Sequence, residues 1–234
     1  MNSRHPFGSV ALLGVCLLLA GGALAHNLSE SSARFVEGLS GPAVGAFLYL
    51  GAKHMVTGYD HLLFLVGVVF FLSRPRDIII FVSLFTLGHS ITLLAGVFER
   101  WQVNAYLVDA VIGLSVVYKA FENIGGFDRA GRFHINARFA VFAFGLFHGL
   151  GLATKLQELA LGDEGLITNM VSFNIGVEIG QMVALSVVLL LLMKWRLSPA
   201  FQRQAFAANA LVMTCGFVFA GYQLTGYLLS RQTL

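Results

Sequence analysis

Long apolar runs separated by short polar stretches make up most of this chain. A helix of about 20 predominantly apolar residues crosses a lipid bilayer. On this pattern, helices are predicted at residues 43–72, 77–98, 104–122, 136–154, 167–193 and 205–229. The fold class that follows is an all-α polytopic membrane protein with six transmembrane helices.

The first predicted helix, residues 43–72, is longer than a single span requires. We expect it to bend near Gly58, with its first half tilted or lying at the membrane interface. On a straight helix, His54 and His61 would share a face but lie about 10 Å apart along the axis, too far to bind one ion together. Two alternatives follow: Gly58 breaks the helix, or each histidine acts with partners from other helices.

The composition supports the membrane assignment. Of the 234 residues, 57% are hydrophobic and 12% are charged, whereas soluble domains carry about 25% charged residues. The formal net charge is only +3. The basic residues of the chain fall in short connections between the apolar runs. This pattern sets membrane topology and gives no indication of nucleic-acid binding. The lipid bilayer is therefore the first expected partner.

Residues 1–25 have the parts of a signal peptide: the basic Arg4, an apolar core at residues 10–19, and the small residues Ala23 and Ala25 before the cleavage point. We divide the chain into this signal peptide (1–25), an extracytoplasmic lead (26–41) and a six-helix transmembrane domain (42–234). Cleavage would make His26 the first residue, whose amine and imidazole form a competent metal chelate. The alternatives are that His26 has no role, or that the segment stays uncleaved as an anchor.

Basic residues are distributed unevenly between the two sets of connections. The connections after the first, third and fifth predicted helices carry Arg74, Arg76, Arg129, Arg132, Arg138, Lys194, Arg196 and Arg203. The connections after the second and fourth carry Arg100 and Lys155. Because basic loops stay in the cytoplasm, we expect a multi-pass membrane protein with its N- and C-termini outside the cytoplasm.

Ionisable residues inside the predicted spans are candidates for function, because such groups are costly in lipid. Counting along each span puts His61, His89, His148 and Glu178 at similar depth. Lipid cannot satisfy these groups, so we expect them to point into the bundle. The alternative is a structural polar core in which they satisfy one another.

Imidazoles and carboxylates together suit a first-row divalent ion such as nickel, cobalt, zinc or copper. The candidate metal ligands are His54, Asp60, His61, His89, His148 and Glu178. The side chains expected to orient these ligands are Asn174, Gln181, Ser90 and Thr92. Asn174, Glu178 and Gln181 are spaced four and three apart, which places them on one stripe of a helix.

Four segments carry a resemblance to a known family: residues 58–65, 85–93, 144–153 and 173–181. In family order and over most of the chain, they are similar to the HupE/UreJ family of bacterial membrane proteins, in particular its second subgroup. The resemblance implies a secondary permease for nickel or cobalt. The family's signature His-x5-Asp-His falls on His54, Asp60 and His61.

A second family signature, Phe-His-Gly-x-[Ala/Val]-His-Gly-x-Glu, is only half kept in this chain. Phe147, His148 and Gly149 match it. Leu152 stands where the family has its second histidine, and Lys155 stands where the family has glutamate. This departure bears on whether the chain is specific for nickel. His89 and Glu178 are the candidates to supply the two missing ligands.

The leading functional hypothesis is a transporter: a divalent metal ion enters from outside, meets His54 and passes to the remaining candidate ligands. The sequence contains no P-loop motif, so transport would be passive or coupled to another ion. The alternative is a membrane assembly or metal-delivery protein that binds a metalloenzyme or other membrane subunits. An intramembrane metalloenzyme ranks last, because di-iron membrane oxidases use more histidines, and we expect no enzymatic activity.

Overall fold

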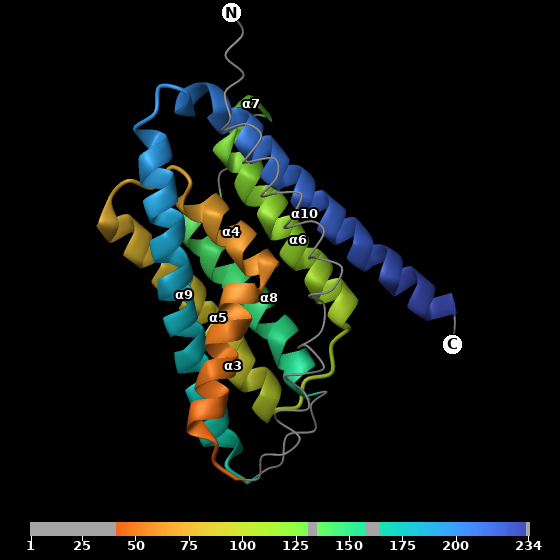
Figure 1. Ribbon diagram of the computed structural model, residues 1–234. Coiled ribbons are helices and arrows are strands. Elements are labelled where there is room, and N and C mark those ends of the chain that lie inside the picture. The colour runs from red at the N-terminus through yellow and green to blue at the C-terminus, as the bar shows by residue number, and fades with distance from the viewer. Residues whose placement is uncertain (1–40, 131–134, 158–163, 233–234) are drawn as a thin grey trace, which may run out of the picture.

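The computed structural model describes residues 41–130, 135–157 and 164–232. These residues contain helices and no strand (Figure 1). The helices are α3 (Val44–Thr57), α4 (Tyr59–Val69), α5 (Pro75–Phe98), α6 (Ala105–Asn123), α7 (Gly126–Ala130), α8 (Ala137–Gln157), α9 (Leu166–Arg196) and α10 (Phe201–Gln232). The predicted signal peptide, His26 and nearly all of the lead at residues 26–41 lie outside the described residues.

Each apolar run gives a helix close to its predicted bounds, and the short helix α7 is an addition that the sequence did not predict. Four helices of the described chain are long and apolar enough to cross a membrane: α5, α8, α9 and α10. Helix α6 carries three charged residues, and α3 and α4 are each too short to span alone. The chain is thus an all-helical membrane protein, and the six-span topology stays a prediction.

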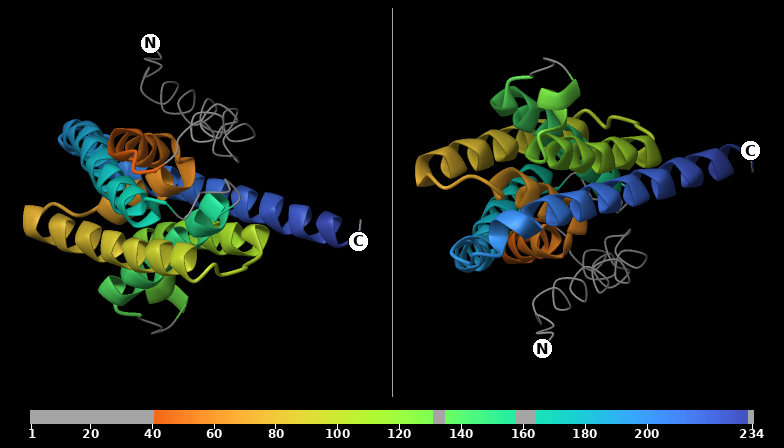
Figure 2. Two further views of the ribbon diagram at one scale, coloured as in Figure 1. Left: turned by 90° about the horizontal axis from the view of Figure 1, so that it is seen from below. Right: turned by 90° about the horizontal axis from the view of Figure 1, so that it is seen from above.

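The helices alternate in direction along the chain (Figure 1). Helices α3 and α4 follow one another end to end and run parallel to α9. The end of α4, the start of α5, the end of α9 and the start of α10 lie toward one end of the bundle, and the end of α5 and the start of α6 lie toward the other. Helix α10 packs along α6, and its C-terminal part projects beyond the other helices (Figure 2).

Three helix pairs make the most extensive contacts: α5 with α8, α3 with α9, and α6 with α10. Glycines bring the backbones of each pair together, as is common in membrane bundles. A Cβ at Gly176 of α9 would overlap the Leu48 carbonyl oxygen of α3, and one at Gly145 of α8 would overlap the Phe85 carbonyl oxygen of α5. In the third pair, a Cβ at Gly113 would lie 2.9 Å from the Ala220 nitrogen. No other residue type fits at these contacts.

Helix α9 is also tied to the α3–α4 segment at both ends. At its start, Asn169 accepts a hydrogen bond from the Ala43 backbone nitrogen (2.7 Å) and donates one to the Gly41 carbonyl oxygen (3.1 Å). At its end, the Arg196 guanidinium donates to the carbonyl oxygens of Val69, Phe70 and Leu72, at and just after the end of α4. The continuous helix α9 therefore supports the interrupted α3–α4 segment along its whole length.

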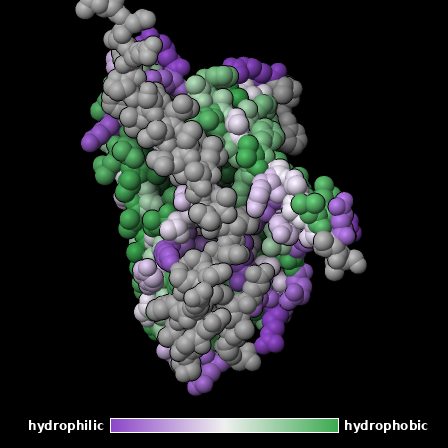
Figure 3. Space-filling view, turned by 45° about the vertical axis from the view of Figure 1, so that its right-hand side comes forward, coloured by the Kyte–Doolittle hydropathy of each residue, from purple (hydrophilic) through white to green (hydrophobic). Residues whose placement is uncertain are grey.

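The buried apolar residues form two clusters, which we call the lower and the upper cluster by their place in Figure 1. The lower cluster includes Phe47, Leu50, Leu93, Val97, Leu152, Leu156 and Phe173. The upper cluster includes Phe64, Val68, Ile78, Phe85, Val141, Leu192 and Phe201. Between them lies a layer of buried polar side chains. On the outside, large hydrophobic side chains are exposed along α5, α9 and α10, and the face in Figure 3 shows hydrophilic residues gathered toward its ends.

The α3–α9 contact generates a stability prediction. Gly176→Ala should lower the free energy of unfolding by about 1–3 kcal/mol, the usual range for overpacking a tight interface. The matched control is Gly45→Ala on α3, because nothing lies within 4 Å of a Cβ at Gly45 and alanine is the better helix former. Thermal unfolding of the purified proteins in detergent measures both. A transition temperature for Gly176→Ala equal to that of Gly45→Ala would contradict the contact.

The alternating helices and the basic connections generate a topology prediction. With six crossings and the basic loops in the cytoplasm, a periplasm-active reporter fused after Leu234 should be active. The same reporter fused after Arg76, in the first turn of α5 and next to the connection from α4, should be inactive. Activity of the Leu234 fusion only with a cytoplasm-specific reporter would exclude the six-span arrangement.

Candidate functional site

Gly58 interrupts the first hydrophobic segment and so brings two histidines together. Its ψ of 97° lies outside the helical region, so α3 ends at Thr57 and α4 begins at Tyr59. A Cβ at Gly58 would lie 2.9 Å from the His54 carbonyl oxygen and 3.0 Å from His61 Nδ1, so this position has room only for glycine. The ring centroids of His54 and His61 are 5.1 Å apart. The broken helix, one of the two alternatives that the sequence left open, is observed, and the other holds as well, because His61 also meets histidines of other helices.

His61 is the centre of a group of four histidines, each from a different helix. Its ring centroid lies 5.1 Å from that of His54 on α3, 5.8 Å from that of His89 on α5 and 4.7 Å from that of His148 on α8. His61, His89 and His148 are only 1–2% exposed. We call the four histidines and Asp60 the His/Asp cluster. Five of the six predicted ligands therefore converge in it.

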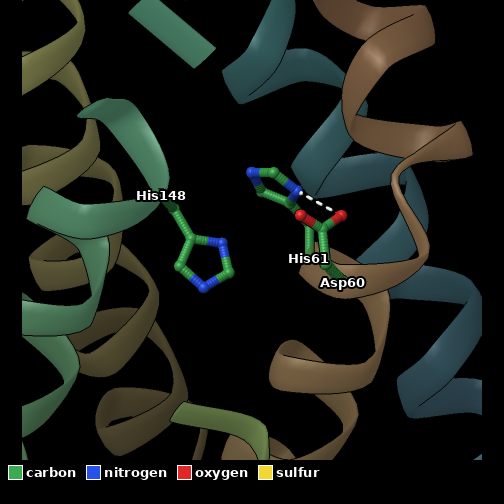
Figure 4. A group of neighbouring side chains, drawn as sticks. All are labelled: Asp60, His61 and His148. Atoms are coloured by element: carbon green, nitrogen blue, oxygen red, sulfur yellow. Dashed lines mark hydrogen bonds and ion pairs between the residues drawn. The ribbon is translucent and has the colours of Figure 1, made fainter. Parts of the chain in front are cut away.

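Asp60 lies beside His61 and determines which nitrogen of the His61 ring is available to bind a metal ion. The Asp60 Oδ1 atom is 3.0 Å from His61 Nδ1, and Figure 4 shows this contact with His148 facing the pair. An ionised carboxylate accepts a hydrogen bond from the Nδ1–H group, which keeps the ring proton on Nδ1 and leaves the lone pair of Nε2 available as a ligand. His61 Nε2 is buried and has no hydrogen-bond partner.

Ser115 on α6 has the same relation to His148, and the sequence analysis did not single it out. Its hydroxyl donates to the Ile112 carbonyl oxygen (2.7 Å), and its oxygen lies 3.4 Å from His148 Nε2. Because the hydroxyl proton is directed at Ile112, the oxygen accepts from Nε2, and His148 Nδ1 keeps its lone pair. The only sequence signal was a serine in an apolar run, which is common in membrane helices.

Buried ring nitrogens without a hydrogen-bond partner distinguish this cluster from an ordinary polar core. They are His54 Nε2, His61 Nε2, His89 Nδ1, His89 Nε2 and His148 Nδ1. Buried polar groups are nearly always satisfied, so five such atoms in one place indicate a ligand. One ligand atom each from Asp60, His61 and His148 lies within 4.8 Å of the others. Metal–nitrogen bonds of about 2.0–2.1 Å place tetrahedral ligands about 3.3 Å apart, so the side chains need to move inward by only about 1–1.5 Å.

Glu178 is the predicted ligand that the structure does not bring to the cluster. Its side chain is exposed, whereas Gly176, Val177 and Gln181 on the same helix are buried. Asn174 and Gln181 lie at the edge of the buried face of α9. At about 100° per residue, Glu178 is rotated by about 40° from Asn174, which carries it past that edge. The stripe predicted from the spacing of these three residues exists, but the packed surface ends before Glu178.

The four residues expected to orient the ligands join helices to one another instead. Asn174 hydrogen-bonds to Ser90 (2.8 Å), and Gln181 accepts a hydrogen bond from Thr86 (2.8 Å), so both connect α9 to α5. Thr92 donates to the Leu146 carbonyl oxygen of α8 (2.6 Å). Among the described residues, none of the four is hydrogen-bonded to a histidine ring. They hold the helices that carry His89 and His148.

A comparison with protein families agrees with the residues of this site. A family model described as HupE / UreJ protein matches residues 30–231, nearly the whole chain. This range includes every residue of the His/Asp cluster and all the helices described above except Gln232, the last residue of α10. No curated protein and no solved structure matches the chain.

The position of His61 at the centre of the cluster generates a binding prediction. His61→Ala should weaken nickel binding by at least about 10-fold, since even outer partners of metal ligands contribute 10–100-fold. Glu178→Gln is the matched control, because it changes an ionisable residue at similar depth that lies outside the cluster. Isothermal titration of the purified proteins with nickel chloride measures both affinities. A loss of binding in Glu178→Gln together with wild-type binding in His61→Ala would place the ion elsewhere.

Proposed function

Because the chain belongs to the HupE/UreJ family, we propose that it is a secondary permease that carries a divalent transition-metal ion, nickel or cobalt, across the bacterial inner membrane. The family is associated with metal uptake. In this proposal the ion is a substrate that binds at His54, Asp60, His61, His89 and His148, and the protein is not an enzyme. Zinc and copper are the other ions that such a donor set suits.

The observation that carries the proposal is the set of buried imidazole nitrogens without partners. A structural polar core would pair these atoms with neighbouring donors and acceptors, as the Asn174–Ser90 and Gln181–Thr86 contacts do. The histidine rings instead face one another at 4.7–5.8 Å between centroids around His61. Neutral imidazole nitrogens with free lone pairs are ligands for nickel, cobalt, copper and zinc.

Exposure differs across the cluster and suggests where an ion enters. His61, His89 and His148 are buried, while His54 and Asp60 are partly exposed, with 19% of the Asp60 side chain accessible. A carboxylate at the more accessible side attracts a cation and gives it a first oxygen ligand. We infer that the ion meets His54 and Asp60 first and then the three buried rings.

The apolar clusters on both sides of the site bear on how an ion would cross. Leu93, Leu152 and Phe173 lie on the lower side, and Phe64 and Phe85 lie on the upper side. A hydrated ion does not pass through packed apolar side chains, so transport requires the helices to move and open one side at a time, as in secondary transporters with a site at mid-membrane. In this proposal the packed side chains of the lower and the upper cluster separate in turn, each opening the site to one side of the membrane.

Transport itself is tested by uptake of radioactive nickel into bacteria that lack their own nickel transporters. Expression of the wild-type chain should raise cellular nickel, His61→Ala should abolish the increase, and Glu178→Gln should retain most of it. Western blots of the membrane fraction control for expression. Tight nickel binding by the purified protein without any uptake would favour the metal-delivery or assembly role over the permease.

A further inference from the structure

An open groove lies between α5 and α8, near the ends where both helices begin. Its volume is about 400 Å³, within the range of about 300–1,000 Å³ that is usual for ligand sites. The side chains that line it are Ile80, Leu84, Arg138, Phe139 and Phe142. Four of these five side chains are apolar, and the fifth carries a positive charge.

The two helices that form the groove run parallel. The contact of Gly145 with Phe85 and the contact of Gly96 with Ala153 advance together along α8 and α5. The starts of the two helices therefore lie at the same end of the bundle, and the groove is placed between their first turns.

The groove opens to the surroundings of the bundle and not to the His/Asp cluster. Thr86 of α5 hydrogen-bonds to Gln181 of α9. Leu84 precedes Thr86 by two residues, so it lies on nearly the opposite side of α5. Phe139 on the other wall is 64% exposed. In a membrane-spanning bundle, an exposed apolar groove of this kind meets lipid chains, which are as apolar as the side chains that line it.

Arg138 gives the groove a charge that the described part of the chain does not neutralise. Within residues 41–130, 135–157 and 164–232, no hydrogen bond or ion pair involves its guanidinium, and its backbone nitrogen donates to the Asn136 side chain (2.9 Å). The starts of α5 and α8 and the residues just before them carry Arg74, Arg76 and Arg138 but only one acidic residue, Asp77. Asp77 lies in the first turn of α5, where a negative charge stabilises its own helix. This end of the pair is therefore net positive.

We propose that the groove binds one anionic phospholipid, with an acyl chain against the four apolar side chains and the headgroup phosphate on Arg138. A guanidinium stays charged and matches the oxygens of a phosphate with two parallel hydrogen bonds. Inorganic phosphate would engage Arg138 alone and leave the apolar walls without a partner, so a lipid is the source of the phosphate. The net positive charge favours an anionic lipid over a zwitterionic one, whose headgroup carries its own cation.

The position of the groove along the membrane agrees with this occupant. The predicted topology puts the starts of α5 and α8 at the cytoplasmic side, where the basic connections lie. Basic pockets between membrane helices on that side bind anionic headgroups. Because α5 carries His89 and α8 carries His148, the bound lipid would hold together the first turns of two helices that supply the His/Asp cluster. The inference does not depend on the proposed permease function.

The test is a competition between two phospholipids that have the same acyl chains and different headgroup charges. The full-length protein, purified in a neutral detergent, is mixed with equal amounts of phosphatidylglycerol and phosphatidylcholine, and native mass spectrometry counts the lipids that it retains. The wild type should retain phosphatidylglycerol over phosphatidylcholine by at least about 5-fold, the factor that one basic residue contributes near a membrane surface. Arg138→Gln should lose most of this preference.

Two further variants separate the groove from the general charge of the protein. Arg203→Gln is the matched control, because it removes the same charge from an exposed position in the first turn of α10, at the same end of the bundle and outside the groove. It should keep the wild-type preference. Phe139→Ala removes part of the apolar wall and keeps Arg138, so it should lower the amount of phosphatidylglycerol retained. Thermal unfolding of each variant checks that it is folded.

Each outcome decides the proposal. Equal retention of the two lipids by the wild type overturns it. An equal loss of preference in Arg203→Gln and Arg138→Gln also overturns it, because the attraction would then belong to the basic end as a whole. Should Arg138→Gln not fold, unchanged retention of phosphatidylglycerol by Phe139→Ala overturns the proposal, and lower retention supports it. None of these measurements involves nickel, so the lipid site and the permease function fail separately.

Discussion

Direct contact between helix backbones at glycines is the constraint on which this site depends. A Cβ at Gly149 would overlap the His89 carbonyl oxygen, so α8 touches α5 at the turn that carries one of the histidines. His148 is the residue before Gly149, and the two rings therefore face the same space. At the α3–α9 contact, Gly51 packs against the backbone at Phe173, which holds the segment with His54 and His61 against a straight helix. Larger residues at these contacts would move the histidine-bearing helices apart.

The same contacts explain how polar groups are kept in a membrane bundle without lipid reaching them. The polar layer lies between two apolar clusters, and helix–helix hydrogen bonds from Thr92, Asn174 and Gln181 connect its walls. These bonds pair polar groups of the residues that support the site, as the interior of a membrane protein requires, although Gln181 Nε2 has no partner. The buried atoms without a hydrogen-bond partner in this layer are concentrated on the histidine rings, with His89 unpaired at both nitrogens.

The sequence predicted the parts of the structure that local patterns determine. Apolar runs located the helices, because the penalty for polar groups in lipid acts over a few residues. Gly58 located the break, where a Cβ would crowd the His54 carbonyl oxygen and the His61 ring. His89 and His148 could be expected to meet His61 because lipid leaves an imidazole nowhere else to point. The parallel pairing of α3 with α9 was not predictable, since the two segments are more than 100 residues apart and nothing local specifies the partner.

Failures of the sequence reasoning came from the rotation of helices, which spacing alone does not fix. Glu178 shares a stripe with Asn174 and Gln181, but the edge of the α3–α9 interface falls between them. Ser90 and Thr92 were expected to orient the metal ligands. They lie one and three residues after His89 in the sequence, yet their side chains point toward other helices. Ser115 was missed because its role depends on α6 meeting α8 at His148. To predict the position of each of these side chains, one must know how its helix is rotated about its own axis.

The packing shows what the residues at the two departures from the family's second signature contact in this chain. Leu152, where the family has histidine, is 2% exposed and belongs to the lower apolar cluster with Leu93 and Val97. Lys155, where the family has glutamate, is paired with Asp109. Both changes remove metal-binding groups from the last two turns of α8, so the remaining donors of α8 reduce to His148. The candidate metal ligands of the described chain are therefore concentrated in one layer around His61.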